Sequence, residues 1–264
     1  MKKQKSENRG HISFSELKIW NECPYKHKLV YLDKIKQFKG NEHTAFGTAM
    51  HHVCENVVVD HDADLLHAFN SKFLEELALL KEKKIELNRK LIEDMRVQGK
   101  SMLTSILPGL KDCFEDYEVI SVEEDLMEPL DDVLHFKGFI DLVIKVGETY
   151  HIIDWKTCSW GWDTKRKADR MTTYQLTLYK NFFAKKHNIE PKDIETHFAL
   201  LKRTAKKDRV EIFRVTSGPK KTENALKLLS MAVYNIKKRN FVKNLASCTG
   251  GYGCEFYNTK FCTR

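Results

Sequence analysis

Two aspartates and a lysine lie in strand-like segments whose spacing can bring them together. Asp141 lies within Gly138-Phe139-Ile140-Asp141-Leu142-Val143, and Asp154 and Lys156 follow in the next apolar segment. Because side chains alternate along a strand, Asp154 and Lys156 project from the same face. If the two strands pair across a turn at Gly147, Asp141 lies near the level of Asp154. The pattern predicts a pocket with two carboxylates beside an ammonium group.

This predicted pocket suits the hydrolysis of a phosphodiester. Paired carboxylates favour Mg²⁺ or Mn²⁺, which keep several waters and bind substrate phosphates. Such a metal activates a bound water and stabilises transition-state charge, while Lys156 can orient the water or neutralise the phosphate. The alternative is an exposed pair of charges on a strand. We favour the metal site, because the flanking Ile152, Ile153 and Trp155 indicate a buried strand, where unpaired charges are costly.

Three further polar side chains become candidates for the same site because Asp141, Asp154 and Lys156 are present. His51 follows Gly47 near the start of a predicted helix and can reach a metal, although such a histidine is more often structural and His52 is an equal rival. Gln175 and Tyr179 are one helical turn apart and share a face. Each can touch phosphate or orient the lysine. The alternative is that both are ordinary residues of an amphipathic helix.

The elements that must position these residues form a mixed α/β plan. Apolar periodicity and turn residues predict helices at about 14–23, 46–59, 65–80 and 87–107, strands at 119–126, 133–146 and 149–158, a helix at 171–187, strands at 197–203 and 210–215, and a long final helix. Pro108-Gly109 is expected to end the helical half, and Ser217 with Pro219 to open the last helix. We expect one domain: a helical part at 11–108, a core at 117–216, and a C-terminal helix with a cysteine tail at 217–264.

The overall charge favours a polyanionic partner. The chain has 45 lysines and arginines against 37 acidic residues, a formal net charge of +8. Nucleic acid is therefore the favoured partner over an acidic membrane surface. Basic segments lie at 165–167, 202–207 and 220–221, and Trp160 and Trp162 can either stack on unpaired bases or cover the core. The basic N-terminus lacks an apolar segment and no long apolar run follows, so we expect a cytoplasmic protein without a membrane span.

Seven cysteines form an odd set that argues against a disulfide framework. Cys54, Cys113 and Cys158 lie among apolar or strand-like neighbours, and we assign them no function. Metal binding or burial as free thiols is the expectation for the others.

The ordered motifs resemble a known family. Gly47-x-x-x-His51, Gly138-x-Ile140-Asp141, Asp154-x-Lys156 and Gln175-x-x-x-Tyr179 are similar to those of the PD-(D/E)XK nuclease superfamily, specifically its RecB-like branch. That branch includes the nuclease domains of the RecBCD and AddAB helicase-nucleases and the CRISPR-associated RecB-like exonucleases. The resemblance spans about residues 11–262.

The resemblance implies a fold and a set of roles. The fold is a restriction-endonuclease-like αβββαβ core, with added N-terminal helices and the C-terminal helix and cysteine tail. His51, Asp141 and Asp154 would be ligands of Mg²⁺ or Mn²⁺ and Lys156 the catalytic lysine. Gln175 and Tyr179 would support the site, and Glu123 falls where relatives often carry an acidic residue.

In several RecB-like exonucleases one cysteine before the core and three after it hold a 4Fe-4S cluster. By this resemblance Cys23, which precedes Pro24, would join Cys248, Cys254 and Cys262. The spacing of the last three is wider than in relatives. Four thiolates would also suit tetrahedral Zn²⁺, which stays the alternative.

The sequence therefore predicts a metal-dependent DNA exonuclease of recombination, repair or phage genome processing. A helicase or recombination partner is not specified by the sequence. Two alternatives are a catalytically silent nucleic-acid-binding protein on the same fold and a metal-stabilised structural module. The presence of Asp141, Asp154 and Lys156 together argues against the first of these alternatives, and the second stays open.

Overall fold

The computed structural model describes residues 10–35, 38–250 and 253–263, so the basic residues 1–9 lie outside the described residues. The chain forms two compact units. The first comprises Met1–Phe38, Asp125–Phe139 and Gly218–Arg264, and the second comprises Lys39–Glu124 and Ile140–Ser217. The expectation of one domain stays a prediction.

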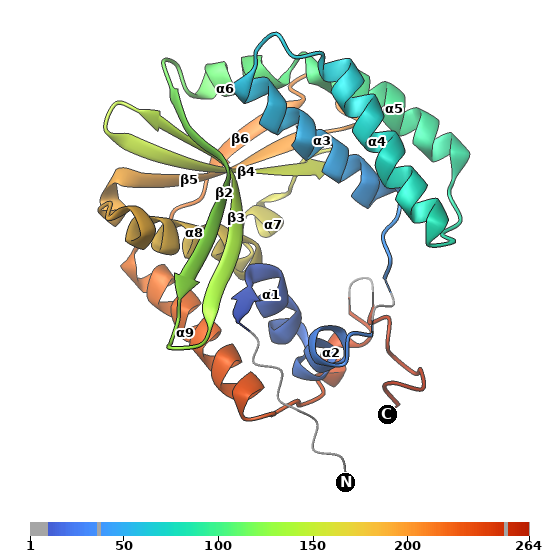
Figure 1. Ribbon diagram of the computed structural model, residues 1–264, viewed down its shortest axis with the longest axis vertical. Coiled ribbons are helices and arrows are strands. Elements are labelled where there is room, and N and C mark those ends of the chain that lie inside the picture. Colours follow the sequence, from blue (N-terminus) through green and yellow to red (C-terminus); the bar gives the residue numbers. More distant parts are fainter. Residues whose placement is uncertain (1–9, 36–37, 251–252, 264) are drawn as a thin grey trace. The chain divides into compact units, whose positions relative to one another are not determined.

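Three helices in the N-terminal part of the second unit begin at residues whose side chains cap the first turn. Asn41, Asp64 and Asn88 each accept a hydrogen bond from a backbone N–H three residues later, which satisfies a donor that the helix leaves unpaired. These helices are α3 (Glu42–Val59), α4 (Leu65–Glu82) and α5 (Arg89–Leu103). They are followed by α6 (Ile106–Cys113), whose N-cap Ser105 makes no such bond (Figure 1).

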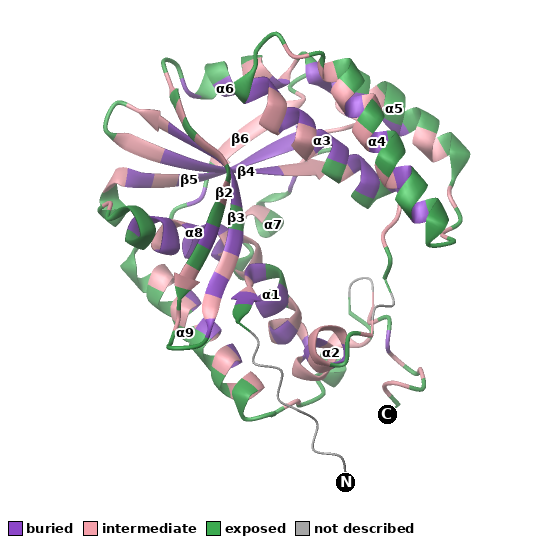
Figure 2. Ribbon diagram, in the orientation of Figure 1, coloured by how far each residue is buried: buried purple, intermediate pink, exposed green. Residues whose placement is uncertain are grey.

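Phenylalanines hold this helical layer together. Phe46 of α3 makes edge contacts with Phe69 and Phe73 of α4, whose rings stack on each other at 5.6 Å between centroids. All three rings are almost fully buried, and so is Trp155 of the neighbouring strand. Figure 2 shows buried residues along α3 and α4. Aromatic pairs of this geometry add to the free energy gained from burial alone.

The sheet of the second unit contains both antiparallel and parallel pairs. The later part of β3 (His135–Val146) pairs antiparallel with β4 (Thr149–Cys158) across a tight turn, where Gly147 has a φ of +56°. After α7 (Thr164–Ala168) and α8 (Arg170–His187), β5 (Ile194–Lys202) pairs parallel with β4. The last strand, β6 (Val210–Arg214), pairs antiparallel with β5.

Helices cover both faces of this sheet. Ile153 and Trp155 of β4 belong to the same buried cluster as Ala49 and Val53 of α3. Side chains alternate along β4, so Asp154 projects from the other face, which α8 covers. The mixed α/β class is confirmed, and it is consistent with a restriction-endonuclease-like fold. The predicted helix between the third and fourth strands corresponds to α8, which the short helix α7 precedes.

The first unit joins the two ends of the chain. The short strand β1 (His11–Ser13) pairs parallel with the beginning of β3, and β2 (Glu118–Pro129), which extends from the second unit into the first, also pairs with β3. The helices α1 (Phe14–Glu22) and α9 (Pro219–Lys237) contact each other, and α2 (Pro24–His27) continues into a π-helical turn at Lys28–Leu32. A short 3₁₀ turn, Leu245–Ser247, precedes the tail.

Two predicted boundaries were wrong for identifiable reasons. Pro108 and Gly109 lie inside α6, because Pro108 is in its first turn, where the helix needs no N–H from that residue. The helix predicted at 87–107 is therefore two helices. Gly218 is the N-cap of α9, whereas the Ser217 hydroxyl bonds to the Thr177 hydroxyl at 2.8 Å.

Among the residues that the structure describes, no helix combines the length and the apolar character that crossing a membrane requires.

A substitution of Gly99 tests the packing of α4 against α5. A Cβ at Gly99 would lie 2.2 Å from Cζ of Phe69, a ring that is fully buried and cannot move aside. Alanine in a helix gains about 1 kcal/mol over glycine, whereas overpacking a core costs about 1–3 kcal/mol. We expect Gly99→Ala to lower the melting temperature, measured by thermal unfolding. Gly10→Ala, which meets no heavy atom within 4 Å, is the control. A melting temperature at or above that of the parent protein would contradict the packing.

Candidate active site

The site lies where strands β3 and β4 separate. Their antiparallel register ends with the pair Leu142 and Ile153, so Asp141 and Asp154 are the next residues across. The Trp155 N–H donates to Oδ2 of Asp141 at 2.7 Å, and this side chain takes the place of the next main-chain partner. The predicted juxtaposition of the two aspartates is present in the structure.

Asp154 is buried and held from two sides. Only 1% of its surface is exposed. Gln175 of α8 donates to its Oδ1 at 2.7 Å, and the Lys156 ammonium forms an ion pair with its Oδ2. Apart from this ion pair, Oδ2 has no hydrogen-bond partner among the described residues. A buried carboxylate oxygen of this kind can accept a cation.

Gln175 and Tyr179 share the helix face that the sequence predicted. Gln175 also donates to the Tyr179 hydroxyl at 3.4 Å, so its amide bridges the tyrosine and Asp154. Tyr179 is 7% exposed. The structure therefore places both residues beside the carboxylates, and Gln175 fixes the orientation of Asp154.

His51 and His52, which the sequence left as rivals, have different surroundings. His51 Nδ1 lies 3.5 Å from Oδ2 of Asp141, and 29% of its side chain is exposed. His52 instead bonds to Asn56 at 3.1 Å. Burial and the charge of Lys156 lower the pKa of His51 to about 4. His51 is therefore neutral at pH 7 and can offer a nitrogen lone pair to a metal.

The two aspartates repel each other in this setting. Burial, followed by the charge of Asp154, raises the pKa of Asp141 well above its usual value, against the effect of Lys156. A divalent cation between the two carboxylates would offset the repulsion between their negative charges. The donor set of Asp141, Asp154 and His51 fits a hard divalent cation such as Mg²⁺ or Mn²⁺, with His51 as the less usual ligand.

A hollow of about 500 Å³ adjoins His51 and contains two glutamates. Glu123 of β2 lines it at a φ of +51°, and Glu55 lines it one turn along α3 from His51. Burial, followed by the charge of Glu123, raises the pKa of Glu55 to about 7. The sequence analysis missed Glu55, although its spacing of four residues from His51 on a predicted helix could have indicated it.

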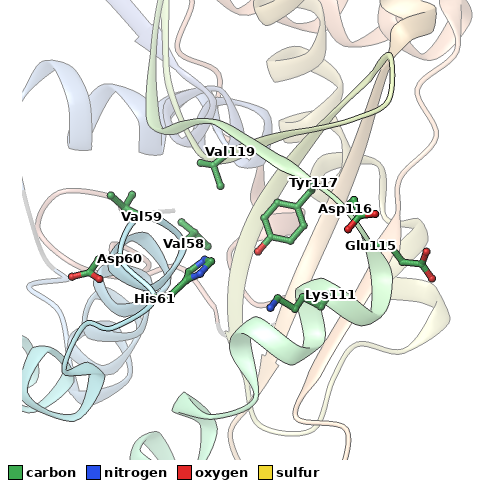
Figure 3. A pocket seen from close by; sticks show the side chains of 9 residues that line it. All are labelled: Val58, Val59, Asp60, His61, Lys111, Glu115, Asp116, Tyr117 and Val119. Carbon is green, nitrogen blue, oxygen red and sulfur yellow. The ribbon is translucent and has the colours of Figure 1, made fainter.

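A larger hollow of about 670 Å³ lies elsewhere in the second unit (Figure 3). Val58 and Val59 border it at the end of α3, together with Lys111 from α6 and Tyr117 before β2. Its lining includes Lys111, Glu115 and Asp116 but none of the predicted site residues.

The two tryptophans after β4 are placed differently. Trp160 is 74% exposed, whereas Trp162 is 7% exposed and packs 5.1 Å from the Phe198 ring between centroids. Trp162 therefore covers the core, and Trp160 is the one available for stacking on a base. Part of the basic surface is already paired, since Lys167 and Lys202 both contact Glu211.

The four candidate cysteines lie in the first unit, in segments that contact one another. Cys23 Sγ accepts from the Asn244 N–H at 3.4 Å, and Cys248 Sγ lies 3.7 Å from the Asn244 carbonyl. The Cys254 N–H donates to the Cys248 carbonyl at 3.0 Å. The tail around Cys262 is hydrogen-bonded to α2, because the hydroxyl of Tyr25 donates to the Phe261 carbonyl at 3.2 Å.

These thiols are not gathered around a single ion. In the described part of the chain, no three of the four cysteine sulfurs lie within 4.8 Å of one another. Tetrahedral Zn²⁺ with Zn–S bonds of about 2.3 Å would hold its sulfurs roughly 3.8 Å apart.

The mixed sheet with its separated acidic strands is consistent with a restriction-endonuclease-like fold. A family model of the PD-(D/E)XK nuclease superfamily matches residues 11–258. The chain therefore belongs to the PD-(D/E)XK nuclease superfamily, and this membership implies a phosphodiester hydrolase. Members of this superfamily use divalent metals.

Among solved structures, the chain is similar to a candidate exonuclease from Eubacterium rectale. The TM-score is 0.57 at 12% identity, over 94% of this chain and 92% of that one, which supports the fold alone. Among curated proteins, a segment of 104 residues is 30% identical to a mitochondrial dicarboxylate transporter of Candida glabrata. That match covers 38% of this chain and 34% of the transporter, so the chain spans about a third of the length of that relative.

The raised pKa of Glu55 predicts a pH dependence of stability. Between the unfolded pKa of 4.5 and the folded pKa of about 7, the unfolded chain loses this proton while the folded chain keeps it. The free energy of unfolding therefore falls as pH rises through this window. Glu55→Gln cannot ionise, so it removes this pH-dependent loss of stability. We therefore expect the difference in melting temperature, variant minus parent protein, to be larger at pH 8 than at pH 5.

The measurement is thermal unfolding in EDTA at both pH values. Glu86→Gln, at an exposed position, is the control and is expected to give the same difference at pH 5 and pH 8. An equal effect of Glu55→Gln at the two pH values would show that Glu55 keeps an ordinary pKa.

Proposed function

We propose that this protein is a metal-dependent DNA exonuclease of the RecB-like branch of its superfamily, acting in recombination, repair or phage genome processing. The observation that carries the proposal is the pair of adjacent carboxylates at the separated strands, with a lysine beside them. Asp141, Asp154 and His51 would hold Mg²⁺ or Mn²⁺. When bound, the metal supplies an activated water and neutralises charge on the phosphate.

Lys156 is placed to act on substrate as well as on Asp154. Its side chain is 31% exposed, and its ammonium lies 5.8 Å from the centre of the Phe198 ring. The ring and Asp154 limit its motion, while the exposed part can meet a phosphate oxygen. Lys156 is therefore assigned to orient the attacking water and to stabilise negative charge in the transition state.

The other residues position these groups. Gln175 holds one oxygen of Asp154 and leaves the second oxygen facing the lysine and the metal position. His51 stays neutral at pH 7 because its pKa is about 4, so it does not compete with the metal for the carboxylates. Trp160, which is exposed, and the net charge of +8 support DNA as the substrate.

Substitution of the acidic site tests the assignment. We expect Asp154→Asn and Lys156→Ala each to reduce DNA cleavage by at least about 100-fold, because each removes a group that acts on the metal or the transition state. Folding, followed by circular dichroism, and DNA binding, followed by fluorescence anisotropy, should be largely retained. Lys145→Ala, on β3 with its ammonium 3.6 Å from Glu148, is the matched control and should cleave normally.

The assay uses end-labelled linear and circular DNA with added Mg²⁺ or Mn²⁺. Cleavage should require a DNA end and should stop in EDTA. Full activity of either site variant would reject the residue assignment. Cleavage of circular DNA at the rate of linear DNA would reject the exonuclease part and leave the nuclease assignment intact.

We also propose that Cys23, Cys248, Cys254 and Cys262 hold a 4Fe-4S cluster, with Zn²⁺ as the alternative. A shared centre would close a loop of over two hundred residues, and its binding free energy would become folding free energy. We expect Cys23→Ser and Cys254→Ser to lower the melting temperature and the solubility markedly. Cys113→Ser, at an exposed position, should have little effect.

The measurements are thermal unfolding and metal analysis of protein purified without oxygen. Brown protein containing about four irons supports the cluster, and colourless protein containing one zinc per four thiols supports the alternative. Metal-free protein whose Cys23→Ser variant is as stable as the parent would reject both.

A further inference from the structure

Two histidines and a glutamate form a compact group on β4 and β5, outside the candidate active site. The side chains are His151, Glu195 and His197. His151 Nδ1 lies 3.1 Å from His197 Nε2, and Oε2 of Glu195 lies 3.8 Å and 3.7 Å from these two nitrogens. We propose that this group is a binding site for a transition-metal ion, Zn²⁺ in preference to Mg²⁺.

The distances match those of ligands around one ion. Zn²⁺ binds imidazole nitrogen and carboxylate oxygen at about 2.0–2.2 Å, so neighbouring ligands of a tetrahedral ion lie roughly 3.3–3.6 Å apart. The three atoms of this group therefore outline one face of a tetrahedron. Two imidazoles with one carboxylate favour zinc, whereas the oxygen-rich pair at Asp141 and Asp154 favours a harder cation.

The backbone explains why the three side chains meet. His151 of β4 lies directly beside Glu195 of β5 in the parallel register, and His197 is two residues further along β5. Side chains two residues apart share a face, so all three project from the same side of the sheet. His151 is three residues from Asp154, so this group and the candidate active site lie on opposite faces of β4.

Neighbouring residues hold the group in position. The Phe114 ring lies 4.9 Å and 5.1 Å from the His151 and His197 rings between centroids, and it covers their apolar side. Arg214 of β6 donates to Oε1 of Glu195 at 2.8 Å, and the other oxygen, Oε2, faces the imidazoles. A hydrogen bond of this kind orients a metal-binding carboxylate. The Glu195 side chain is 24% exposed, so solvent and ions can reach the group.

Charge is consistent with metal binding at neutral pH. The charged groups that act on the imidazoles are Arg214 and Glu195. Lys180 in turn interacts electrostatically with Arg214 and Glu195. Burial, followed by the neighbouring histidine and Arg214, lowers the pKa of His197 to about 3, and burial also lowers that of His151. Both imidazoles are therefore neutral at pH 7. A metal would replace the hydrogen bond between them. The ring that donates this bond would move its proton to its other nitrogen, and the accepting ring already carries its proton there.

The alternative is a structural hydrogen bond between two buried histidines without a metal. That reading explains the 3.1 Å contact of the two rings but does not require the Glu195 carboxylate beside both nitrogens. With three protein ligands, the ion would keep a fourth position for water or another small ligand. It would also link β4 to β5, on the strand that carries Asp154 and Lys156, so we expect it to stabilise the second unit.

The test is metal binding by the full-length protein after treatment with EDTA. Zn²⁺ is titrated by calorimetry, and Co²⁺ serves as a coloured probe of tetrahedral sites. We expect one site with nitrogen and oxygen ligands, recognised by visible Co²⁺ bands without thiolate charge transfer. His197→Gln should remove this site, whereas Asp154→Asn and Cys254→Ser should retain it. His61→Gln, at an exposed histidine of the same unit, is the matched control.

Glu195→Gln is a second test of the same site that does not depend on the folding of the His197→Gln variant. Its amide oxygen can still accept from Arg214, so the fold should be kept, while zinc affinity should fall at least about tenfold. The proposal does not depend on nuclease activity. Unchanged zinc affinity and stoichiometry in folded Glu195→Gln protein would overturn it, as would a parent protein whose only zinc or cobalt site is lost in Cys254→Ser or Asp154→Asn.

Discussion

The candidate site depends on the hydrogen bond that the Trp155 N–H donates to the Asp141 carboxylate. Beyond the Leu142 and Ile153 pair the two strands no longer bond through their main chains, and a main-chain donor inside the protein must find another partner. Asp141 supplies that partner, so its carboxylate is fixed beside Asp154. The same contact that satisfies the sheet therefore also assembles the acidic pair.

Burying two carboxylates together is unfavourable, and the neighbouring residues show how the fold compensates. Lys156 forms an ion pair with Asp154, and Gln175 donates to its other oxygen. The pKa of Asp141 is nevertheless raised. The site thus retains an excess of negative potential that a divalent cation can relieve, as catalytic sites with perturbed pKa values often do.

Strand β4 carries different chemistry on its two faces. Asp154 faces α8 and the proposed Mg²⁺ or Mn²⁺ position, whereas His151 faces Phe114 and the proposed zinc position. The alternation of side chains along a strand keeps the two groups apart although only three residues separate them. One rigid strand can therefore hold an oxygen-rich site on one face and a nitrogen-rich site on the other.

The sequence alone determined the class of fold and the main acidic residues. Local signals were sufficient there: the apolar runs around Asp141 and Asp154 identify strands, Gly147 identifies the turn, and the spacing of Gln175 and Tyr179 identifies a helix face. Such features depend on neighbours within a few residues, so they can be predicted without a structure.

Only the tertiary structure decided which distant residues meet. It separated His51 from His52, placed Glu55 beside Glu123, buried Trp162 while leaving Trp160 exposed, and joined His151 to His197. The ends of elements also depended on it, since Ser217 bonds to Thr177 and leaves Gly218 as the cap of α9. The physical reason is that these contacts follow from strand register and helix packing across long sequence separations, and neither is encoded in the spacing of nearby residues.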